Sequence, residues 1–175
     1  MADFNKVLAP GDWQDGLVNT VIEIPMGSAH KIEWDRKRVV FMLDRVEPAI
    51  FAKPVNYGFI PGTIDEDGDE LDTLVVTNEP LPTGIWLEAK VVGILNFEDD
   101  GEMDYKVVCV PSDDRNTGDS INSLEDLGKR LQQQIEHHFT HYKDLKKPGS
   151  TKVLGWGDAE EAKKIIKECI DRFNG

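Results

Sequence analysis

The sequence predicts an α+β fold with a mainly β core, in which short strands fill the first two thirds of the chain and two helices end it. Three observations predict this class: β-branched or aromatic runs up to residue 111, apolar spacings of three and four after residue 127, and no alternation of strand and helix segments. Five or six strands are enough to close a small barrel, with an open sheet as the alternative. Because the 175 residues contain no linker or repeat, we expect one domain over residues 1–175.

Six strands are expected, because each run is rich in β-branched or aromatic residues and turn residues bound most of them. In chain order they cover residues 21–27, 30–35, 38–46, 72–77, 85–97 and 105–111. The segments "PVNYGFIPG" (54–62) and "NEPLPTG" (78–84) are rich in Pro and Gly, so they are predicted to connect strands.

Two helices are expected after the strands. The first lies within residues 127–147, with Ser123 and Asp126 as alternative N-caps. Its apolar face consists of Leu127, Leu131, Ile135, His138, Phe139 and Tyr142. The second begins after Asp158, and Glu161 occupies the capping-box position. Its apolar stripe consists of Ala162, Ile165, Ile166, Cys169, Ile170 and Phe173.

The charge balance limits the partners of the chain. Twenty basic and 33 acidic residues give a net charge of −13, which repels a phosphate backbone, so nucleic acid is not an expected partner. No run approaches the roughly 18 apolar residues of a membrane helix, and no signal peptide is recognised. Cys109 and Cys169 lie far apart in unrelated contexts. Such cysteines are typical of reduced thiols, so we expect a cytoplasmic protein.

An acidic turn precedes the strand expected at 72–77. Six carboxylates crowd into residues 64–72, and three of them, Asp67, Asp69 and Asp72, form the pattern D-G-D-x-x-D. Gly68 lets the backbone turn tightly between the first two, so the three side chains can converge. Converging carboxylates repel one another unless a cation neutralises them, and oxygen donors suit Mg²⁺, Mn²⁺ or Ca²⁺. The pattern therefore indicates a metal site, with a solvated acidic hairpin as the alternative.

A second acidic turn strengthens the metal interpretation. Residues 97–106, "FEDDGEMDYK", place Asp99 and Asp104 near another strand end, followed by Lys106. Two such turns suggest more than one metal in one site, which is the usual device for activating water against phosphorus. An EF-hand is excluded, because a loop that puts Gly68 sixth ends on Leu74 instead of Glu.

Cations that could hold an anionic substrate lie on separate strands. Lys31 and Glu33 alternate with Ile32 and so share one side of their strand. Taken singly, each of the basic and tyrosine residues is typical of an ordinary surface position. Their combination with the two acidic turns indicates a site for a phosphorylated anion; the set adds Arg45, Tyr57, Tyr142 and Lys143.

The motifs resemble those of the family I soluble inorganic pyrophosphatases of the bacterial type. The resemblance covers roughly residues 18–172, and its most specific part is D-G-D-x-x-D beside "NYGFIPGT". Further matching segments are "VIEIPMGSAHKIEWD", "LDRVEPAIFAKPV", "VGILNFEDDGEMDYKVVCVP", "HHFTHYKDL" and "GWGDAEEA". The resemblance implies an OB-like closed five-stranded β-barrel with flanking helices, two of them near the C-terminus.

The resemblance also implies an inorganic diphosphatase that hydrolyses pyrophosphate to two orthophosphates. Several Mg²⁺ ions would act per site, with Mn²⁺ or Zn²⁺ as substitutes and Ca²⁺ as an inhibitor. A metal-bridged water or hydroxide would attack directly, with Asp69 as general base. The implied metal ligands are Asp67, Asp72, Asp99, Asp104, Glu23 and Glu33, with Asp72 bridging two ions. The implied substrate-binding residues are Lys31, Arg45, Tyr57, Lys106, Tyr142 and Lys143.

Two positions depart from the family pattern. Glu70 stands where Pro usually follows D-G-D, and Ala52–Lys53 stands where an aromatic residue is common. We interpret Lys53 as a surface lysine, with added positive potential at the rim of the site as the alternative. Asp65, Glu66 and Glu70 are interpreted as rim charges.

His137 and His141 are four residues apart and therefore share a helix face. A zinc site is not favoured, because H-E-x-x-H and a third ligand are missing. The bacterial relatives that this helix resembles have the same histidines between two trimers, so the resemblance implies a homohexamer.

Two other functions remain open from the residues alone. An OB-like module that binds polyanions or nucleic acid without hydrolysis would need a basic groove with stacking aromatics, which the net charge does not favour. A calcium-stabilised structural domain would use the same acidic turns without any hydrolysis.

Overall fold

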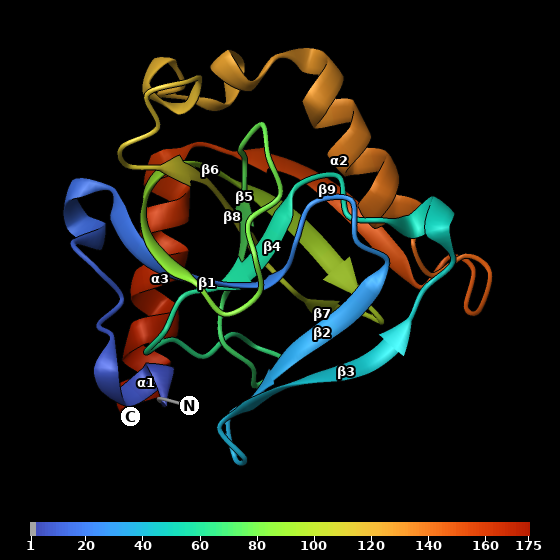
Figure 1. The fold of residues 1–175 in the computed structure, drawn as a ribbon, viewed down its shortest axis with the longest axis horizontal. Coiled ribbons are helices and arrows are strands. Elements are labelled where there is room, and N and C mark those ends of the chain that lie inside the picture. Colours follow the sequence, from blue (N-terminus) through green and yellow to red (C-terminus); the bar gives the residue numbers. More distant parts are fainter. Residues whose placement is uncertain (1–2) are drawn as a thin grey trace.

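Five strands form a curved β-sheet that closes into a ring in the computed structural model, which describes residues 3–175 (Figure 1). Around the ring, each strand pairs with the next: β1 (Leu17–Ile24), β4 (Asn56–Phe59), β5 (Asp72–Val75), β8 (Lys106–Pro111) and β6 (Trp86–Asp99). The ring closes because β6 also pairs with β1. Only the pair of β5 and β8 is parallel within this ring. The expected α+β class and closed five-stranded barrel are confirmed.

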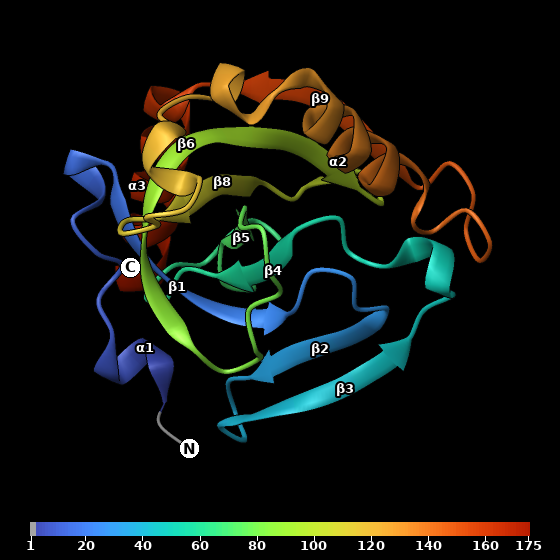
Figure 2. The same ribbon diagram turned by 45° about the horizontal axis from the view of Figure 1, so that its top comes forward.

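The remaining elements surround the ring. A separate antiparallel pair, β2 (His30–Asp35) with β3 (Val40–Val46), projects beside it as a two-stranded ribbon (Figure 2). Two more strands pair with β6: β7 (Glu102–Met103) and β9 (Thr151–Gly157). The α-helices are α1 (Phe4–Val7), α2 (Lys129–His141) and α3 (Ala159–Asn174). Short 3-10 turns cover Trp13–Asp15, Ala49–Phe51, Gly118–Ser120 and Leu124–Leu127.

Strand β6 is long enough to pair with β8 along one edge and with both β1 and β9 along the other, and its pairing with β1 closes the ring. Its residues 86–90 pair with β1, and its residues 94–99 pair with β9. The pairing with β8 shifts register between Val91 and Gly93, where a bulge bends the strand. Gly93 lies under the 3-10 turn, since a Cβ there would come within 2.5 Å of Leu124 Cγ. The packing of this 3-10 turn on β6 therefore depends on a residue without a side chain.

The helices cover the ring with the apolar faces that the sequence predicts. Helix α3 packs on β6, and Ala162, Ile165, Ile166 and Cys169 are buried there. Asp158 caps this helix as expected, because its Oδ1 accepts the N–H of Glu161 at 2.9 Å. Helix α2 packs on β9 and buries Ile135 and Phe139. No helix in the described part of the chain has the length and apolar character needed to span a membrane.

Three strands were not predicted: β4, the two-residue β7 and β9. Residues 54–62 were expected to be a connection, yet they contain β4, all four residues of which are buried. The Pro and Gly residues hide this strand in the sequence, and Gly58 is required for packing. A Cβ on Gly58 would lie 2.1 Å from the carbonyl oxygen of Val21 on β1. Strand β9 lies between the two helices, so the expected order of strands first and helices last is wrong there.

The start of the first helix also differs from its prediction. Helix α2 begins at Lys129 and ends at His141, inside the expected range of 127–147. The candidate caps Ser123 and Asp126 belong to the preceding 3-10 turn, where Asp126 Oδ2 accepts the Ser123 N–H at 2.9 Å. Gly128, at φ +74°, separates the two elements, because this backbone conformation cannot continue a helix.

Candidate active site

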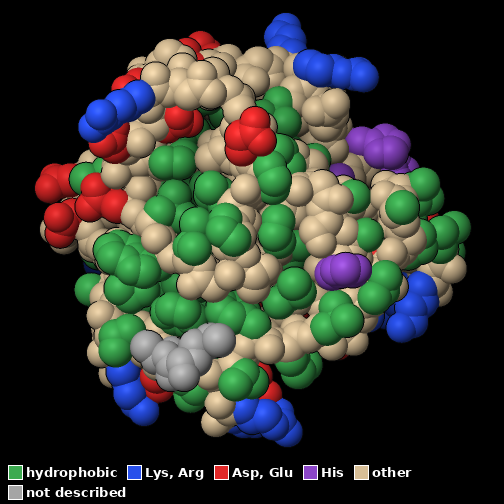
Figure 3. All heavy atoms as spheres, viewed as in Figure 1, with side chains coloured by type: hydrophobic (Ala, Val, Ile, Leu, Met, Phe, Trp, Pro, Cys, Tyr) green, Lys and Arg blue, Asp and Glu red, His purple; other side chains and the backbone are tan. Residues whose placement is uncertain are grey.

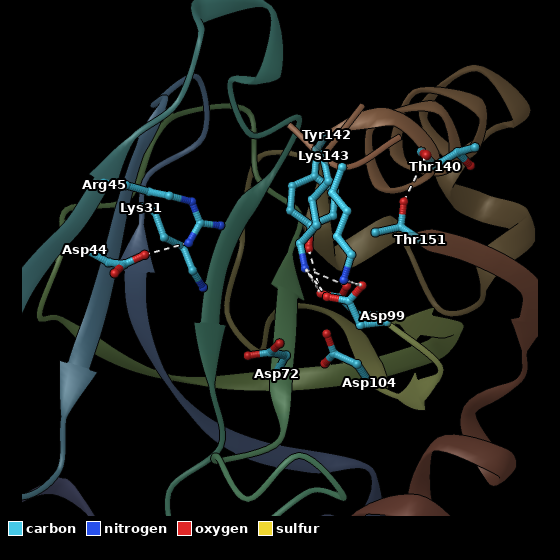
Figure 4. A network of polar contacts seen from close by, with 12 residues as sticks. Lys31, Asp44, Arg45, Asp72, Asp99, Asp104, Thr140, Tyr142, Lys143 and Thr151 are labelled. Atoms are coloured by element: carbon cyan, nitrogen blue, oxygen red, sulfur yellow. Dashed lines mark hydrogen bonds and ion pairs between the residues drawn. The ribbon is translucent and has the colours of Figure 1, made fainter. Parts of the chain in front are cut away.

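All thirteen residues predicted as site residues line one open cavity of about 310 Å³. The ribbon forms one side of this cavity, and the ring together with the end of α2 forms the other side. Figure 4 shows Lys31 and Arg45 reaching in from one side, Tyr142 and Lys143 from the other, and Asp72 and Asp104 between them. The thirteen are Glu23, Lys31, Glu33, Arg45, Tyr57, Asp67, Asp69, Asp72, Asp99, Asp104, Lys106, Tyr142 and Lys143.

Lys106 lies at the floor of the cavity between two carboxylates. Strands β5 and β8 run parallel with Asp72 opposite Lys106, and this register brings the two side chains together. Lys106 Nζ donates to Asp72 Oδ2 at 2.5 Å and also to Asp104 Oδ1. Burial opposes the charge of Lys106, but the two carboxylates outweigh burial and raise its pKa. Tyr57 donates its hydroxyl to the same Asp72 oxygen.

The acidic loop takes the shape of a tight turn. The N–H of Gly68 donates to Asp65 O at 3.1 Å, and the N–H of Asp69 donates to Asp67 Oδ1 at 3.0 Å. Gly68 has φ +91°, in the left-handed region that glycine adopts without strain. The turn leaves Asp67 and Asp69 exposed at the mouth of the cavity, while Asp72 begins β5.

The second acidic turn is held by the segment after α2. Asp99, at the end of β6, accepts from Lys143 Nζ at 2.5 and 2.6 Å and from the Tyr142 hydroxyl at 3.0 Å. These contacts join residues more than 40 positions apart in the sequence. They fix Tyr142 and Lys143 so that both side chains face the cavity (Figure 4).

The ribbon presents cations to the cavity because of its register. Lys31 on β2 lies directly opposite Arg45 on β3. Lys31 Nζ lies 3.3 Å from Glu33 Oε1, so these two side chains share one side of the strand as expected. Arg45 pairs with Asp44 at 2.6 Å and with Glu47. The cations are thus held by carboxylates that an anionic ligand can replace.

Two properties suit the carboxylates of the cavity to divalent cations. Their oxygen atoms are the donors that such ions prefer, and a bound cation offsets the free-energy cost of burying their negative charge. Burial raises the pKa of Glu23 to about 8 and that of Asp104 to about 7, and the charge of Asp72 adds to both shifts. Among residues 3–175, no three His, Cys, Asp or Glu side chains form a ready-made metal cluster. Lys106 occupies the space between Asp72 and Asp104 instead, so a bound cation would have to share or take over that position.

Three interpretations of charged residues are wrong. Asp65 and Glu70, expected at the rim, are only 3% and 8% exposed. Asp65 accepts the N–H groups of Glu66 and Tyr105 at 2.8 and 3.1 Å, so it fixes the turn from inside. Glu70 accepts a hydrogen bond from Asn5 Nδ2 at 2.6 Å, an interaction that no local sequence pattern predicts. The third case is Lys53, which is a half-buried residue of the cavity wall and not a surface lysine.

A closed barrel whose mouth joins clustered carboxylates to cations defines a class of proteins, the enzymes that act on phosphorylated anions with the help of divalent metals. Comparison with known proteins narrows this class. The family model for inorganic pyrophosphatase matches residues 20–174, and this chain therefore belongs to the inorganic pyrophosphatase family.

Relatives of high similarity support this membership. An inorganic pyrophosphatase of Neisseria meningitidis serogroup B is 66% identical over 174 residues, covering 99% of this chain and 98% of the relative. The crystal structure of an inorganic pyrophosphatase from Neisseria gonorrhoeae matches with a TM-score of 0.97 at 64% identity, covering 98% and 99% of the two chains. That from Thermus thermophilus matches with a TM-score of 0.91 at 40% identity, covering 99% and 100%.

The family and the enzyme class expected from the sequence, an inorganic diphosphatase, are therefore confirmed. Membership of this family also implies a divalent metal cofactor.

Proposed function

We propose that this chain hydrolyses inorganic pyrophosphate to two orthophosphates by direct attack of water, with Mg²⁺ as its metal. The observation that carries the proposal is the convergence of eight carboxylates, five cations and two tyrosine hydroxyls on one cavity. Divalent ions, when bound, neutralise the charge of the substrate and acidify water. Mn²⁺ or Zn²⁺ would substitute for Mg²⁺, and Ca²⁺ would inhibit.

The carboxylates of the cavity divide by position. Asp67, Asp72 and Asp104 would hold the ions that bind before the substrate, with Asp72 shared between two of them. Support comes from their common place near Lys106, whose charge already balances two of them. The ions that arrive with the substrate would be held by Asp99 together with Asp104, and by Glu23 and Glu33.

The cations and hydroxyls would bind the two phosphoryl groups. Pyrophosphate carries several negative charges, so water is repelled from it until those charges are balanced. Lys31 and Arg45 reach it from the ribbon, and Lys106 and Tyr57 from the barrel strands. Tyr142 and Lys143 approach from the end of α2. A substrate held from three directions keeps its reacting phosphorus fixed relative to the attacking water.

Asp69 is proposed as the general base. Its side chain is 82% exposed at the mouth, and its nearest cation is Arg36, whose Nη2 lies 3.6 Å from Asp69 Oδ1. A carboxylate in this position can take a proton from water and release it to solvent. Both cysteines, Cys109 and Cys169, are buried, so neither thiol is placed to attack the substrate.

We also propose a homohexamer that works in the cytoplasm. The rings of His137 and His141 lie 4.6 Å apart between centroids, tilted by 51°, and line a groove with Ile50, which is 76% exposed. Figure 3 shows hydrophobic side chains gathered across the centre of one face, a surface that favours self-association. Both cysteines are free thiols, as a reducing compartment favours.

A phosphate-release assay tests this proposal. The chain with pyrophosphate and Mg²⁺ should release two orthophosphates per substrate, and a chelator should stop the reaction. Asp69→Asn should slow turnover by about 10²-fold or more. Asp113→Asn is the matched control, because Asp113 is exposed and pairs only with exposed Arg115. A folded, Mg²⁺-loaded chain without turnover would contradict the proposal. An unchanged rate in Asp69→Asn would exclude Asp69 as the general base.

A further inference from the structure

Lys53 lies in the cavity wall at a position fixed by backbone hydrogen bonds. It follows the 3-10 turn Ala49–Phe51 and precedes β4. Its carbonyl oxygen accepts the N–H of Gly27 at 2.9 Å, and its own N–H donates to Ser28 O at 2.9 Å. These two bonds tie it to the connection between β1 and β2. The direction in which its side chain leaves the backbone is therefore set by the fold.

The side chain of Lys53 ends among aromatic rings of the cavity. Its Nζ lies 4.9 Å from the ring centroid of Tyr57, 5.1 Å from that of Tyr142 and 5.5 Å from that of Phe139. Each of these distances allows a cation–π contact. Behind it, His138 Nε2 lies 3.5 Å away. Burial lowers the pKa of His138 to about 3, so this ring is neutral at pH 7 and adds no repelling charge.

Lys53 differs from the other cations of the cavity in having no carboxylate partner. Lys31, Arg45, Lys106 and Lys143 each form an ion pair. Within residues 3–175, Lys53 forms none. A cation withdrawn from water without an opposite charge costs free energy that the aromatic rings offset only in part. Such an arrangement is favourable when an anion completes it.

Lys53 also completes a group of three ammonium groups around one ring. Lys31 Nζ and Lys106 Nζ lie 5.5 and 5.6 Å from the centroid of Tyr57, the ring on which Lys53 also lies. Burial together with these two neighbouring charges lowers the pKa of Lys53 to about 7. Three cations gathered this closely repel one another, and a multiply charged anion relieves that repulsion.

We propose that Lys53 is a further substrate-binding residue, whose ammonium group contacts a phosphoryl oxygen of pyrophosphate beside Tyr57. This inference rests on the proposed function of the cavity. It gives this chain one more phosphate-binding cation than the pattern of motif residues predicts. Lys53 belongs to the pair Ala52–Lys53, which stands where the motif commonly has an aromatic residue.

The experiment compares Lys53→Met, Lys53→Gln and Lys53→Arg with the wild-type chain. The probe is methylenediphosphonate, a non-hydrolysable analogue of pyrophosphate, titrated calorimetrically in the presence of Mg²⁺. We expect both neutral variants to bind the analogue about tenfold more weakly and to raise KM by a similar factor, since a charge-assisted contact of this kind contributes about that much. The kcat of each should stay within about threefold, and Lys53→Arg should restore most of the affinity.

Lys152→Met is the matched control, because Lys152 is an exposed lysine of β9 away from the cavity. Two neutral variants are used so that a folding defect in one leaves the other to be measured. Equal analogue affinity in the wild-type chain and a folded neutral variant overturns the role of Lys53. If Lys53→Arg binds the analogue as weakly as Lys53→Met does, the proposed role of Lys53 is also overturned, because the charge would then be irrelevant. A wild-type chain that releases no phosphate overturns the proposed function instead.

Discussion

The two sides of the cavity are built from elements of different stability. On the barrel side, β5 and β8 are interior strands of the closed ring, and their apolar residues are buried. On the other side, β2 and β3 pair only with each other, and β3 leaves Val40, Met42, Leu43 and Val46 exposed. An isolated pair of strands is marginally stable in water. Figure 2 shows the ribbon lying beside the ring and not within it.

This difference fits the two kinds of ligand that we propose for the cavity: metal ions, which need fixed ligands, and a substrate, which must enter and leave. Asp72, Asp104 and Lys106 lie on or beside interior strands, so the proposed metal-binding side has fixed positions. Lys31 and Arg45 lie on the ribbon, which can move as a unit when a substrate enters or a product leaves. We therefore infer that the barrel side determines the affinity for the ions that bind before the substrate, whereas the cations of the ribbon contribute to substrate affinity.

Trp34 and Arg36 attach the ribbon to the rest of the molecule. The Trp34 ring packs against Phe4, with ring centroids 4.8 Å apart, and the backbone N–H of Trp34 donates to Glu23 Oε1 at 2.6 Å. Arg36 donates to Gly68 O at 2.9 Å and so joins the ribbon to the acidic turn. Changes at these residues should affect the ribbon before they affect the barrel.

The largest effect is expected on the barrel side. Asp72→Asn should lower kcat/KM for pyrophosphate by about 10³-fold, because it removes the carboxylate that we propose as a shared metal ligand and leaves Lys106 with one carboxylate fewer. Steady-state kinetics at several Mg²⁺ concentrations measure this loss. A drop of less than tenfold at every Mg²⁺ concentration would exclude Asp72 from the metal site.

The next effect is expected where the ribbon is attached. Trp34→Ala should lower the free energy of unfolding by about 3 kcal/mol, since it leaves a cavity in the aromatic cluster that Trp34 forms with Phe4, Phe41 and Phe59. Urea denaturation measures the change. Trp34→Phe is the control and should lose much less, because the Trp34 indole N–H has no hydrogen-bond partner within the described chain. Equal losses in both variants would mean that the ring packing does not hold the ribbon.

A smaller effect is expected for a single cation of the ribbon. Arg45→Gln should raise KM about tenfold, the loss of one charge-assisted contact, and should change kcat less than KM. Arg38→Gln on the same ribbon is the control, since Arg38 is 75% exposed and pairs with Asp35. A fall in kcat with KM unchanged would contradict a binding role for Arg45.

The smallest effect concerns the pH dependence of stability. Burial lowers the pKa of Lys53 from 10.5 to about 7, and Lys31 and Lys106 add to this shift. Between these values the unfolded chain binds a proton that the folded chain lacks, so the free energy of unfolding rises with pH in this window. Below pH 7 both states are protonated and the full cost of the charge remains.

Lys53→Met should therefore be more stable than the wild-type chain below pH 7, and the gain should shrink between pH 7 and 10. We expect a gain of about 1–2 kcal/mol, because water in the open cavity screens part of the charge. Thermal unfolding without ligands at pH 6 and pH 9.5 measures it. A variant less stable than wild type at pH 6 would show that Lys53 stabilises the fold.

Residues of the site were predictable where one local motif carries several of them. Asp67, Asp69 and Asp72 share one turn, and Lys31 and Glu33 share one strand face, so spacing alone predicts that they lie together. Helix α3 was predictable for the same reason, since Asp158 and the apolar stripe are local signals. Such features depend on contacts a few residues apart.

The features that the sequence did not predict depend on contacts between distant residues. The surroundings of Lys53 come from Tyr57, Phe139 and Tyr142, which the fold alone brings together. Strand β4 was missed because Gly58 resembles a turn residue, although it is there to admit the backbone of β1. The burial of Glu70 depends on a partner 65 residues away. Charge type alone does not distinguish a rim carboxylate from an internal one.

One measurement tests the division between barrel and ribbon most directly: calorimetric titration of Mg²⁺ into the substrate-free chain and into Asp72→Asn and Arg45→Gln. The account predicts that Asp72→Asn weakens Mg²⁺ binding by about tenfold or more. Arg45→Gln should leave it unchanged or slightly tighter, because a repelling cation is removed from a site that the barrel holds in place. Mg²⁺ binding weakened equally by both changes would contradict this division, since the ribbon would then help to hold the ions that bind before the substrate.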